Sequence, residues 1–181
     1  MLKTFLGTLI LVSTVFGSMT YRQELENLSP AQYAVLLHSL ESGKSDDLGL
    51  TLAAIAWKES SFGKNKINTN DGRHGSYGSH QVLLTSAAGY LKANNLVNVS
   101  LDNNVAQKRI LINALVNNER ISIRFALEEL KYWAKRHNGD YRKMVASYNA
   151  GNLGIKSPAG KKYAADVAYR VRVLKEFLAS N

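Results

Sequence analysis

The spacing of apolar and polar residues predicts a mainly helical chain. Apolar positions recur at intervals of three and four residues in most segments, as on one face of a helix. Ser29-Pro30 and Ser157-Pro158 each place a capping serine before a proline, a typical helix start. The predicted helices cover residues 30–40, 46–61 (capped by Asp46 or Asp47), 85–93, 140–151, 158–178, and two segments between 103 and 136 that separate near Asn117 and Asn118.

One polar segment, residues 64–80, breaks this pattern. It contains the run "NDGRHGSYGSH", in which glycines and other turn-forming residues alternate with polar side chains. Such a run favours a turn or a small hairpin over a helix. We therefore expect a mainly α domain with a small loop or β-hairpin region around residues 64–80.

The N-terminal residues 1–18 have the pattern of a secretory signal peptide. Lys3 supplies a positive charge, an uncharged apolar run extends from Phe5 to Phe16, and Gly17 and Ser18 suit a cleavage site. The run is shorter than the roughly 20 apolar residues that span a bilayer. We expect a periplasmic or secreted protein without a stable membrane anchor after cleavage, with residues 19–181 as a single domain; a core helix is the alternative reading of the apolar run.

Composition narrows the choice of partners. The chain has no cysteine, so neither disulfides nor thiolate metal sites are expected, and its net charge of +9 suits an anionic partner. The lysines and arginines are spread over several predicted helices and lack the interleaved aromatics of a nucleic-acid-binding stripe, so we expect no nucleic acid partner. The four histidines show no metal-ligand spacing, and no metal is predicted.

Glu59 is the most informative charged residue. Ile55 and Leu52 lie four and seven residues earlier, so Glu59 continues the apolar face of its helix. Partial burial and the negative end of the helix both raise the pKa of a carboxyl group. A carboxyl that stays protonated near neutral pH suits a general acid. The alternative is a surface glutamate that pairs with Lys58 or Lys64.

Three motifs, "KESSFGKN", "GSYGSHQV" and "ASYNAG", occur in this order along the chain. In this order they resemble the catalytic domain of soluble lytic transglycosylases, in which a Glu-Ser pair precedes a Phe, a Gly-Leu-Met-Gln segment follows, and an Ala-Tyr-Asn-Ala-Gly motif comes later. The resemblance covers roughly residues 48–181. It implies a lysozyme-like helical fold of the goose-type lysozyme and transglycosylase kind.

The resemblance also implies the site residues. Glu59 matches the catalytic acid of the family. Ser79-His80 replaces the usual Leu-Met pair, so His80 stands where the family has a groove-lining methionine. Helix capping by Ser60 and helix-end packing of the tyrosine-asparagine motif remain alternatives to substrate contact. The expected substrate-binding residues are Ser60, His80, Gln81, Tyr148, Asn149 and Tyr163.

The implied reaction is cleavage of the MurNAc–GlcNAc bond of peptidoglycan glycan strands by one glutamate, giving a 1,6-anhydro product without metal or cofactor. A hydrolytic muramidase would need a second acid, for which Asp71 is a candidate although its "NDG" context already explains it as a turn residue. A non-catalytic peptidoglycan-binding module is a further alternative. A role in a cell-envelope-spanning apparatus is compatible with each of these readings.

Overall fold

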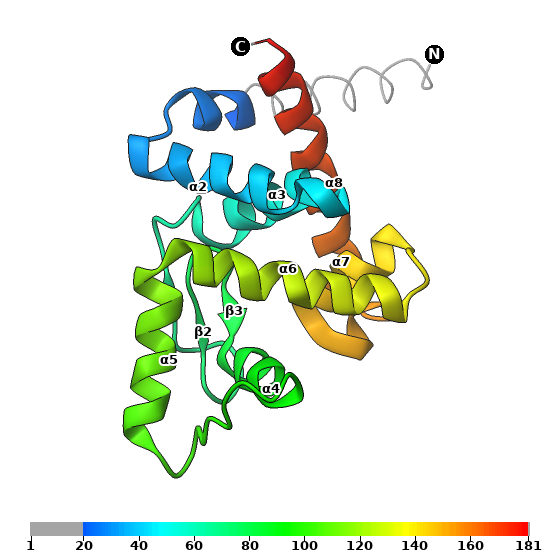
Figure 1. Ribbon diagram of the computed structural model, residues 1–181. Helices are drawn as coiled ribbons and strands as arrows, with labels where there is room; N and C mark the ends of the chain where they lie inside the picture. Colours follow the sequence, from blue (N-terminus) through cyan, green and yellow to red (C-terminus); the bar gives the residue numbers. More distant parts are fainter. Residues whose placement is uncertain (1–19, 181) are drawn as a thin grey trace.

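The computed structural model describes residues 20–180, and the predicted signal peptide lies outside them (Figure 1). The sheet is antiparallel, with its three strands in chain order. This mostly helical architecture with a small sheet near residues 64–80 confirms the predicted class. The labelled elements are α2 (Pro30–Ser42), η1 (Lys44–Asp46), α3 (Gly49–Ser60), β1 (Ile67–Asn68), β2 (Ser76–Tyr77), β3 (Val82–Leu83), α4 (Leu84–Ala93), α5 (Val105–Asn117), α6 (Glu119–Arg136), α7 (Tyr141–Gly154) and α8 (Pro158–Ala179).

The helix starts follow local capping chemistry. Ser29 and Gln32 form a reciprocal capping box, in which Gln32 N donates to Ser29 Oγ at 3.4 Å and Ser29 N donates to Gln32 Oε1 at 3.1 Å. At the start of α7, Asp140 Oδ1 accepts a hydrogen bond from Lys143 N at 3.0 Å. Ser157 likewise caps α8. These three caps confirm the predicted helix starts.

The predicted aspartate cap of α3 is wrong. This helix begins at Gly49, and its preceding residue, Leu48, makes no side-chain capping bond. Asp47 instead ends η1 in the left-handed region, with φ of 56°. The backbone crosses closely at this point: a Cβ on Gly43 would lie 2.5 Å from Gly49 N, and a Cβ on Gly49 would lie 2.4 Å from Leu40 O, so both positions need glycine. Sequence spacing alone does not report such an approach.

The helix α3 lies at the centre of the core. It packs against α2 and α8, and Ala53, Ala54, Ile55 and Ala56 are all fully buried. A helix that is apolar on every side is buried on every side. The side of α3 that faces away from Glu59 is therefore covered by protein as well, and apart from Leu50 only residues of its last turn are partly exposed.

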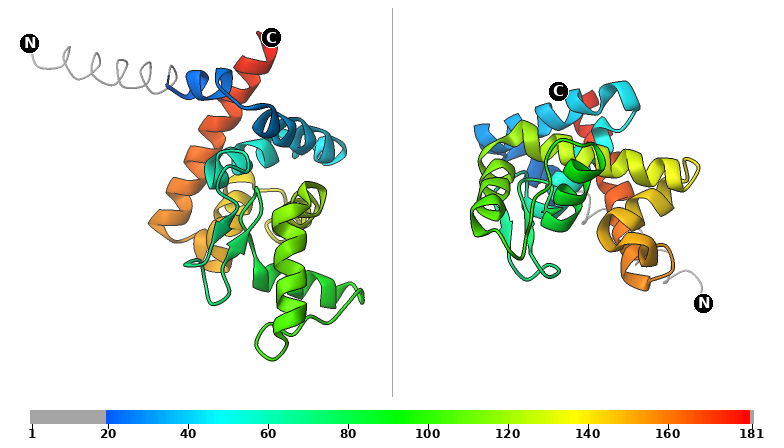
Figure 2. Two further views of the ribbon diagram at one scale, coloured as in Figure 1. Left: turned by 90° about the vertical axis from the view of Figure 1, so that its left-hand side faces the viewer. Right: turned by 60° about the horizontal axis from the view of Figure 1, so that its bottom comes forward.

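The elements form two groups joined by α6. The sheet, α4 and α5 lie on one side, and α2, α3 and α8 lie on the other (Figure 2). The long helix α6 contacts α2 and α7 as well as α4, α5 and β3. None of the helices in the described part of the chain is long and apolar enough to cross a membrane.

The end of α3 is fixed by an unusual turn. Ser61, Phe62 and Gly63 all have positive φ, at 51°, 55° and 83°. Phe62 is buried and its ring stacks on Trp57 with centroids 5.9 Å apart. A phenylalanine in the left-handed region is strained, so its burial against Trp57 offsets that strain. This turn holds Glu59 in the last turn of α3.

Candidate active site

Glu59 is half-buried, and its environment raises the pKa of its carboxyl. Burial is the largest cause, because it removes water from the charged form. Tyr163 and Lys58 lower the pKa, and the negative charge of Asp71 raises it. The carboxyl is thus held toward its protonated form between side chains from α3, α8 and the 64–80 loop.

Lys58 does not form an ion pair with Glu59. Its ammonium group pairs with Asp166, which also accepts a hydrogen bond from Arg170 Nε at 3.3 Å. The same ammonium lies 5.1 Å from the centre of the Tyr163 ring. No ion pair involves Glu59 in the described part of the chain. The surface ion pair with Lys58 that we considered is therefore absent.

Tyr163 is the aromatic residue whose side chain interacts with the Glu59 carboxyl. Its ring is buried, and burial and the nearby Glu59 together raise the pKa of its hydroxyl well above the ordinary value. The hydroxyl interacts with the Glu59 carboxyl, yet it makes no hydrogen bond of normal geometry within residues 20–180. A buried hydroxyl without a well-formed hydrogen bond is costly, and a ligand oxygen beside Glu59 would complete its hydrogen bonding.

The tyrosine-asparagine motif lies near the end of the regular part of α7. Tyr148 is buried, and its hydroxyl donates to the carbonyl oxygen of His80 at 2.8 Å. Asn149 is exposed. The helix is then interrupted at Ala150 and Gly151, where Gly151 has a φ of 60°. The motif therefore connects α7 to the loop that follows β2 and leaves the asparagine side chain open to solvent.

Gln81 and Ser60 both fasten that loop. Gln81 has φ of 48°, and its amide donates to Asn65 O at 3.1 Å and Gly78 O at 3.0 Å. The hydroxyl of Ser60 donates to Ser79 O and accepts from Gly63 N at 2.7 Å. Both side chains are buried and fully engaged with protein groups. They face the interior, so they hold the loop against α3 and do not offer polar atoms to a ligand.

His80 also points inward. Its side chain is fully buried between two serines, with Ser79 Oγ 2.8 Å from Nδ1 and Ser39 Oγ 3.3 Å from Nε2. Burial lowers the pKa of the imidazole to about 4, so the ring is neutral at pH 7. The structure thus corrects the expectation that His80 replaces a groove-lining side chain: only its backbone carbonyl reaches Tyr148.

Glu129 is a second half-buried carboxyl, which the sequence reasoning missed. It lies four residues after Phe125 and four before Trp133, so it occupies the buried face of α6. Burial raises its pKa to about 7, while Trp133 and Ser86 lower it. The Ser86 hydroxyl donates to Glu129 Oε1 at 3.3 Å. Its position on the apolar face of a helix, the signal that identified Glu59, would have identified Glu129 as well.

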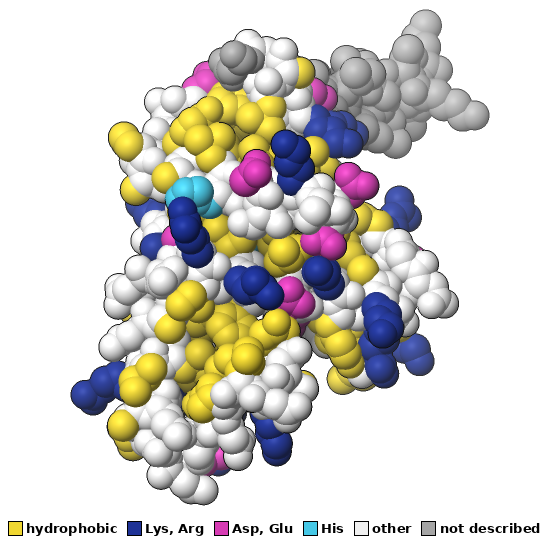
Figure 3. All heavy atoms as spheres, in the orientation of Figure 1, with side chains coloured by type: hydrophobic (Ala, Val, Ile, Leu, Met, Phe, Trp, Pro, Cys, Tyr) yellow, Lys and Arg dark blue, Asp and Glu magenta, His cyan; other side chains and the backbone are white. Residues whose placement is uncertain are grey.

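Glu129 lines a groove of about 950 Å³ between α4 and α6. Figure 3 shows apolar side chains gathered over this region. The groove is lined in part by the aromatic residues Tyr90, Phe125, Tyr132 and Trp133. Aromatic faces with a few polar groups are typical of carbohydrate-binding sites. The two carboxylates of Glu59 and Glu129 both raise the pKa of the Tyr148 hydroxyl, so Tyr148 lies near both acids.

No three histidine, aspartate or glutamate side chains within the described residues come together as a metal site would require. The groups beside Glu59 are a carboxylate, an ammonium and a phenol. Their chemistry is that of proton transfer and hydrogen bonding.

Comparison with known proteins assigns the chain to a family. Residues 41–170 match the model of the transglycosylase SLT domain. Over 128 residues the chain is 35% identical to the uncharacterized 20.7 kDa protein in the vs-regB intergenic region of Enterobacteria phage T4; this match covers 71% of the chain and 63% of the relative, so the chain spans less than two thirds of it. No solved structure matches. Because the family model spans well over half of the chain and the helical fold agrees with it, the chain belongs to the transglycosylase SLT domain family, with the lysozyme-like fold of that family.

Proposed function

We propose that the protein is a peptidoglycan lytic transglycosylase that cleaves the MurNAc–GlcNAc β-1,4 bond and leaves a 1,6-anhydroMurNAc end. One observation carries the proposal: Glu59 is a desolvated carboxyl outside any ion pair of the described residues, next to the buried hydroxyl of Tyr163, which has no partner other than that carboxyl among these residues. Such a carboxyl stays protonated at higher pH than a solvated one and can donate its proton.

In this reaction Glu59 first donates its proton to the glycosidic oxygen as the bond to C1 of MurNAc breaks. The N-acetyl group of the same sugar assists departure, as the family resemblance implies. The Glu59 carboxylate then takes the proton of the 6-hydroxyl, whose oxygen forms the new bond to C1. Glu59 ends protonated again and no water is consumed. The Tyr163 hydroxyl is placed to hydrogen-bond to a sugar oxygen beside the acid.

A hydrolytic muramidase on the same fold is the second candidate, and Asp71 is the observation that favours it. Among the carboxylates of the described residues, Asp71 is the one whose charge acts on Glu59. A carboxylate opposite the acid could activate a water molecule, as in inverting glycosidases. The two reactions differ in their products, because the anhydro product is lighter by one water.

Digestion of purified sacculi followed by mass spectrometry tests the proposal. We expect anhydro-muropeptides from the wild type and a loss of roughly 10²- to 10⁴-fold in rate for Glu59→Gln, the range typical of a general acid. Glu41→Gln, at an exposed position in α2, is the matched control and should retain full activity. Hydrated muropeptides would support hydrolysis, whereas binding without any release would support the non-catalytic module.

The remaining proposals concern location and partners. Action on peptidoglycan requires the protein to reach the cell wall, and we propose that residues 1–18 direct its export to the periplasm or beyond. N-terminal sequencing of exported protein should then begin near residue 19, and retention of Met1 would argue against this. A role within a cell-envelope-spanning apparatus would appear as co-purification with envelope proteins after cross-linking in cells.

A further inference from the structure

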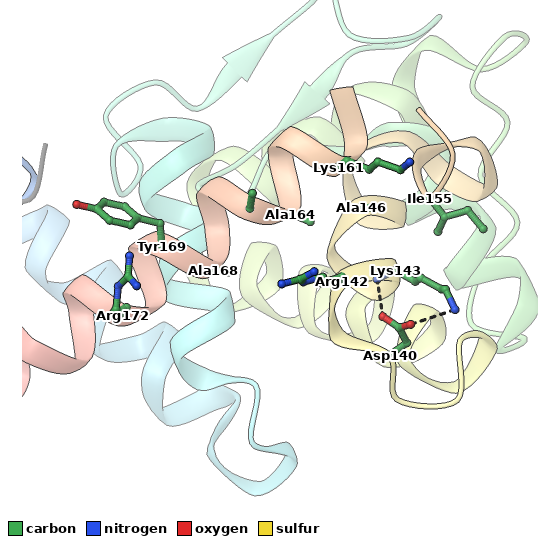
Figure 4. Close-up of a pocket in the computed structure, with 11 residues that line it drawn as sticks. Asp140, Arg142, Lys143, Ala146, Ile155, Lys161, Ala164, Ala168, Tyr169 and Arg172 are labelled. Atoms are coloured by element: carbon green, nitrogen blue, oxygen red, sulfur yellow. Dashed lines mark hydrogen bonds and ion pairs between the residues drawn. The ribbon is translucent and has the colours of Figure 1, made fainter. Parts of the chain in front are cut away.

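A second groove, of about 730 Å³, lies between α7 and α8 (Figure 4). Its floor is made of small side chains, among them Ala146, Ala164 and Ala168. Its walls carry the cations Arg142, Lys143, Lys161 and Arg172, together with a single carboxylate, Asp140. The groove is therefore open to solvent and mainly basic.

Most of this charge is uncompensated. Lys143 Nζ lies 3.0 Å from Asp140 Oδ2, so these two groups neutralise each other. The side chains of Arg142, Lys161 and Arg172 have no carboxylate within ion-pair distance in the described part of the chain. Arg172 is kept in place by the ring of Tyr169, 4.9 Å from its guanidinium carbon. Three cations are thus available to an anionic ligand.

The groove is separate from Glu59. Successive residues of a helix are rotated by about 100°, so the groove-facing residues of α8, such as Lys161 and Ala168, lie on the opposite side of the helix from Tyr163, which faces Glu59. Lys161 and Arg172 are eleven residues apart, about 16 Å along the axis. Cations spread over that length match a chain with several anionic groups better than a single small anion.

We propose that this groove binds the carboxylate-bearing peptide stems of peptidoglycan, at a site distinct from the one that cleaves the glycan. The inference rests on the proposed function, which makes peptidoglycan the substrate. Guanidinium groups pair with carboxylates in a bidentate manner, and a floor of alanines lets a peptide backbone approach both helices closely. The stem would hold the enzyme on the wall while Glu59 acts on sugar.

The test compares two soluble probes in the Glu59→Gln background, which prevents turnover. The probes are uncrosslinked glycan strands that carry peptide stems and the same strands after an amidase has removed the stems. We expect the stem-bearing strands to bind roughly tenfold more tightly at low salt, as expected for a few exposed ion pairs. The Arg142→Gln/Lys161→Gln/Arg172→Gln variant should bind both probes alike, and the preference should weaken as salt rises.

A matched control removes three other exposed cations, with the changes Lys92→Gln, Arg120→Gln and Lys175→Gln. It lowers the net charge by the same amount as the groove variant and should keep the tenfold preference for stem-bearing strands. If the control lost this preference too, net charge alone would explain the effect, and the proposal would be overturned. Equal binding of both probes by the parent protein would overturn it too, as would tighter binding of a phosphate polymer of the same charge.

The failure of the proposed function gives a different result. If wild-type protein does not cleave stem-free strands but the stem preference and its loss in the groove variant persist, the catalytic proposal fails and the groove proposal stands. If the wild type cleaves stem-free strands normally but shows no preference for stem-bearing strands, the groove proposal fails and the catalytic proposal stands.

Discussion

Replacement of Glu129 by glutamine should change how stability depends on pH. Burial raises the pKa of Glu129 from 4.5 to about 7, so the folded protein binds a proton that the unfolded chain releases. The stability linked to this group is fully present below about pH 4.5 and is lost as pH rises through 7. Buried His80 acts in the opposite sense, because its pKa falls from 6.5 to about 4. Its contribution is present above pH 6.5 and is lost as pH falls toward 4.

The two effects are of similar size. Each pKa difference corresponds to about 1.4 kcal/mol per pH unit, which gives up to about 3 kcal/mol for either group. We expect about 2–3 kcal/mol for Glu129, because its side chain retains some contact with solvent. Between about pH 4.5 and 6.5 the two slopes have opposite sign and largely offset each other. The summed contribution of these two groups should therefore be nearly flat in this window and decline between about pH 6.5 and 7.

Urea unfolding at a series of pH values measures the effect. Glu129→Gln should be more stable than wild type by about 2–3 kcal/mol at pH 8 and close to it at pH 4.5. Between those values the variant should reveal the rising slope of His80. Glu176→Gln, at an exposed position of α8, is the control and should leave the profile unchanged. A difference between Glu129→Gln and wild type that is the same at pH 4.5 and 8 would refute the reasoning.

Three further substitutions test the site and the loop beside it. Tyr163 lowers the pKa of Glu59, so Tyr163→Phe should move the alkaline limb of the kcat profile to higher pH. Asp71 raises that pKa, so Asp71→Asn should move the limb to lower pH while activity persists; complete loss of activity would instead favour the hydrolytic role of Asp71. Gly78 has φ of 85° and a Cβ there would overlap Ser122 Oγ, so Gly78→Ala should lower the free energy of unfolding by about 2–4 kcal/mol, measured by urea denaturation.

The helical fold could be predicted because its signals are local. Ser29-Pro30, Asp140 and Ser157-Pro158 act within one turn of the helices that they start, and the structure places a capping bond at each. The turn-rich composition of residues 64–80 is equally local, and the sheet formed there is correspondingly small. The start of α3 could not be read in this way, since it depends on a backbone crossing between α2 and α3.

The sequence motifs predicted which residues lie near the acid, but not the direction in which their side chains point. Gln81 and His80 follow the motif order, yet their partners are Asn65, Gly78 and Ser39, which lie 16, 3 and 41 residues away. A motif reports which residues are near one another, whereas burial decides whether a side chain faces a ligand or the interior. His80 is the clearest case, because a polar ring in a groove-lining position turned inward to meet two serines.

Glu129 shows both the strength and the limit of reasoning from an acid's position on the apolar face of a helix. An acid on the apolar face of a helix is desolvated wherever that face is covered, so the rule finds Glu59 and Glu129 alike. The rule does not say which of them reacts. The surroundings separate them: Glu129 accepts a hydrogen bond from Ser86, whereas Glu59 has around it a phenol with no other partner, an ammonium and a carboxylate. Those three groups come from α8, α3 and the 64–80 loop, and they meet only in the folded chain. A proton donor needs neighbours that can respond to the charge it leaves behind, and of these two acids Glu59 is the one with such neighbours, which is why we propose it as the catalytic acid.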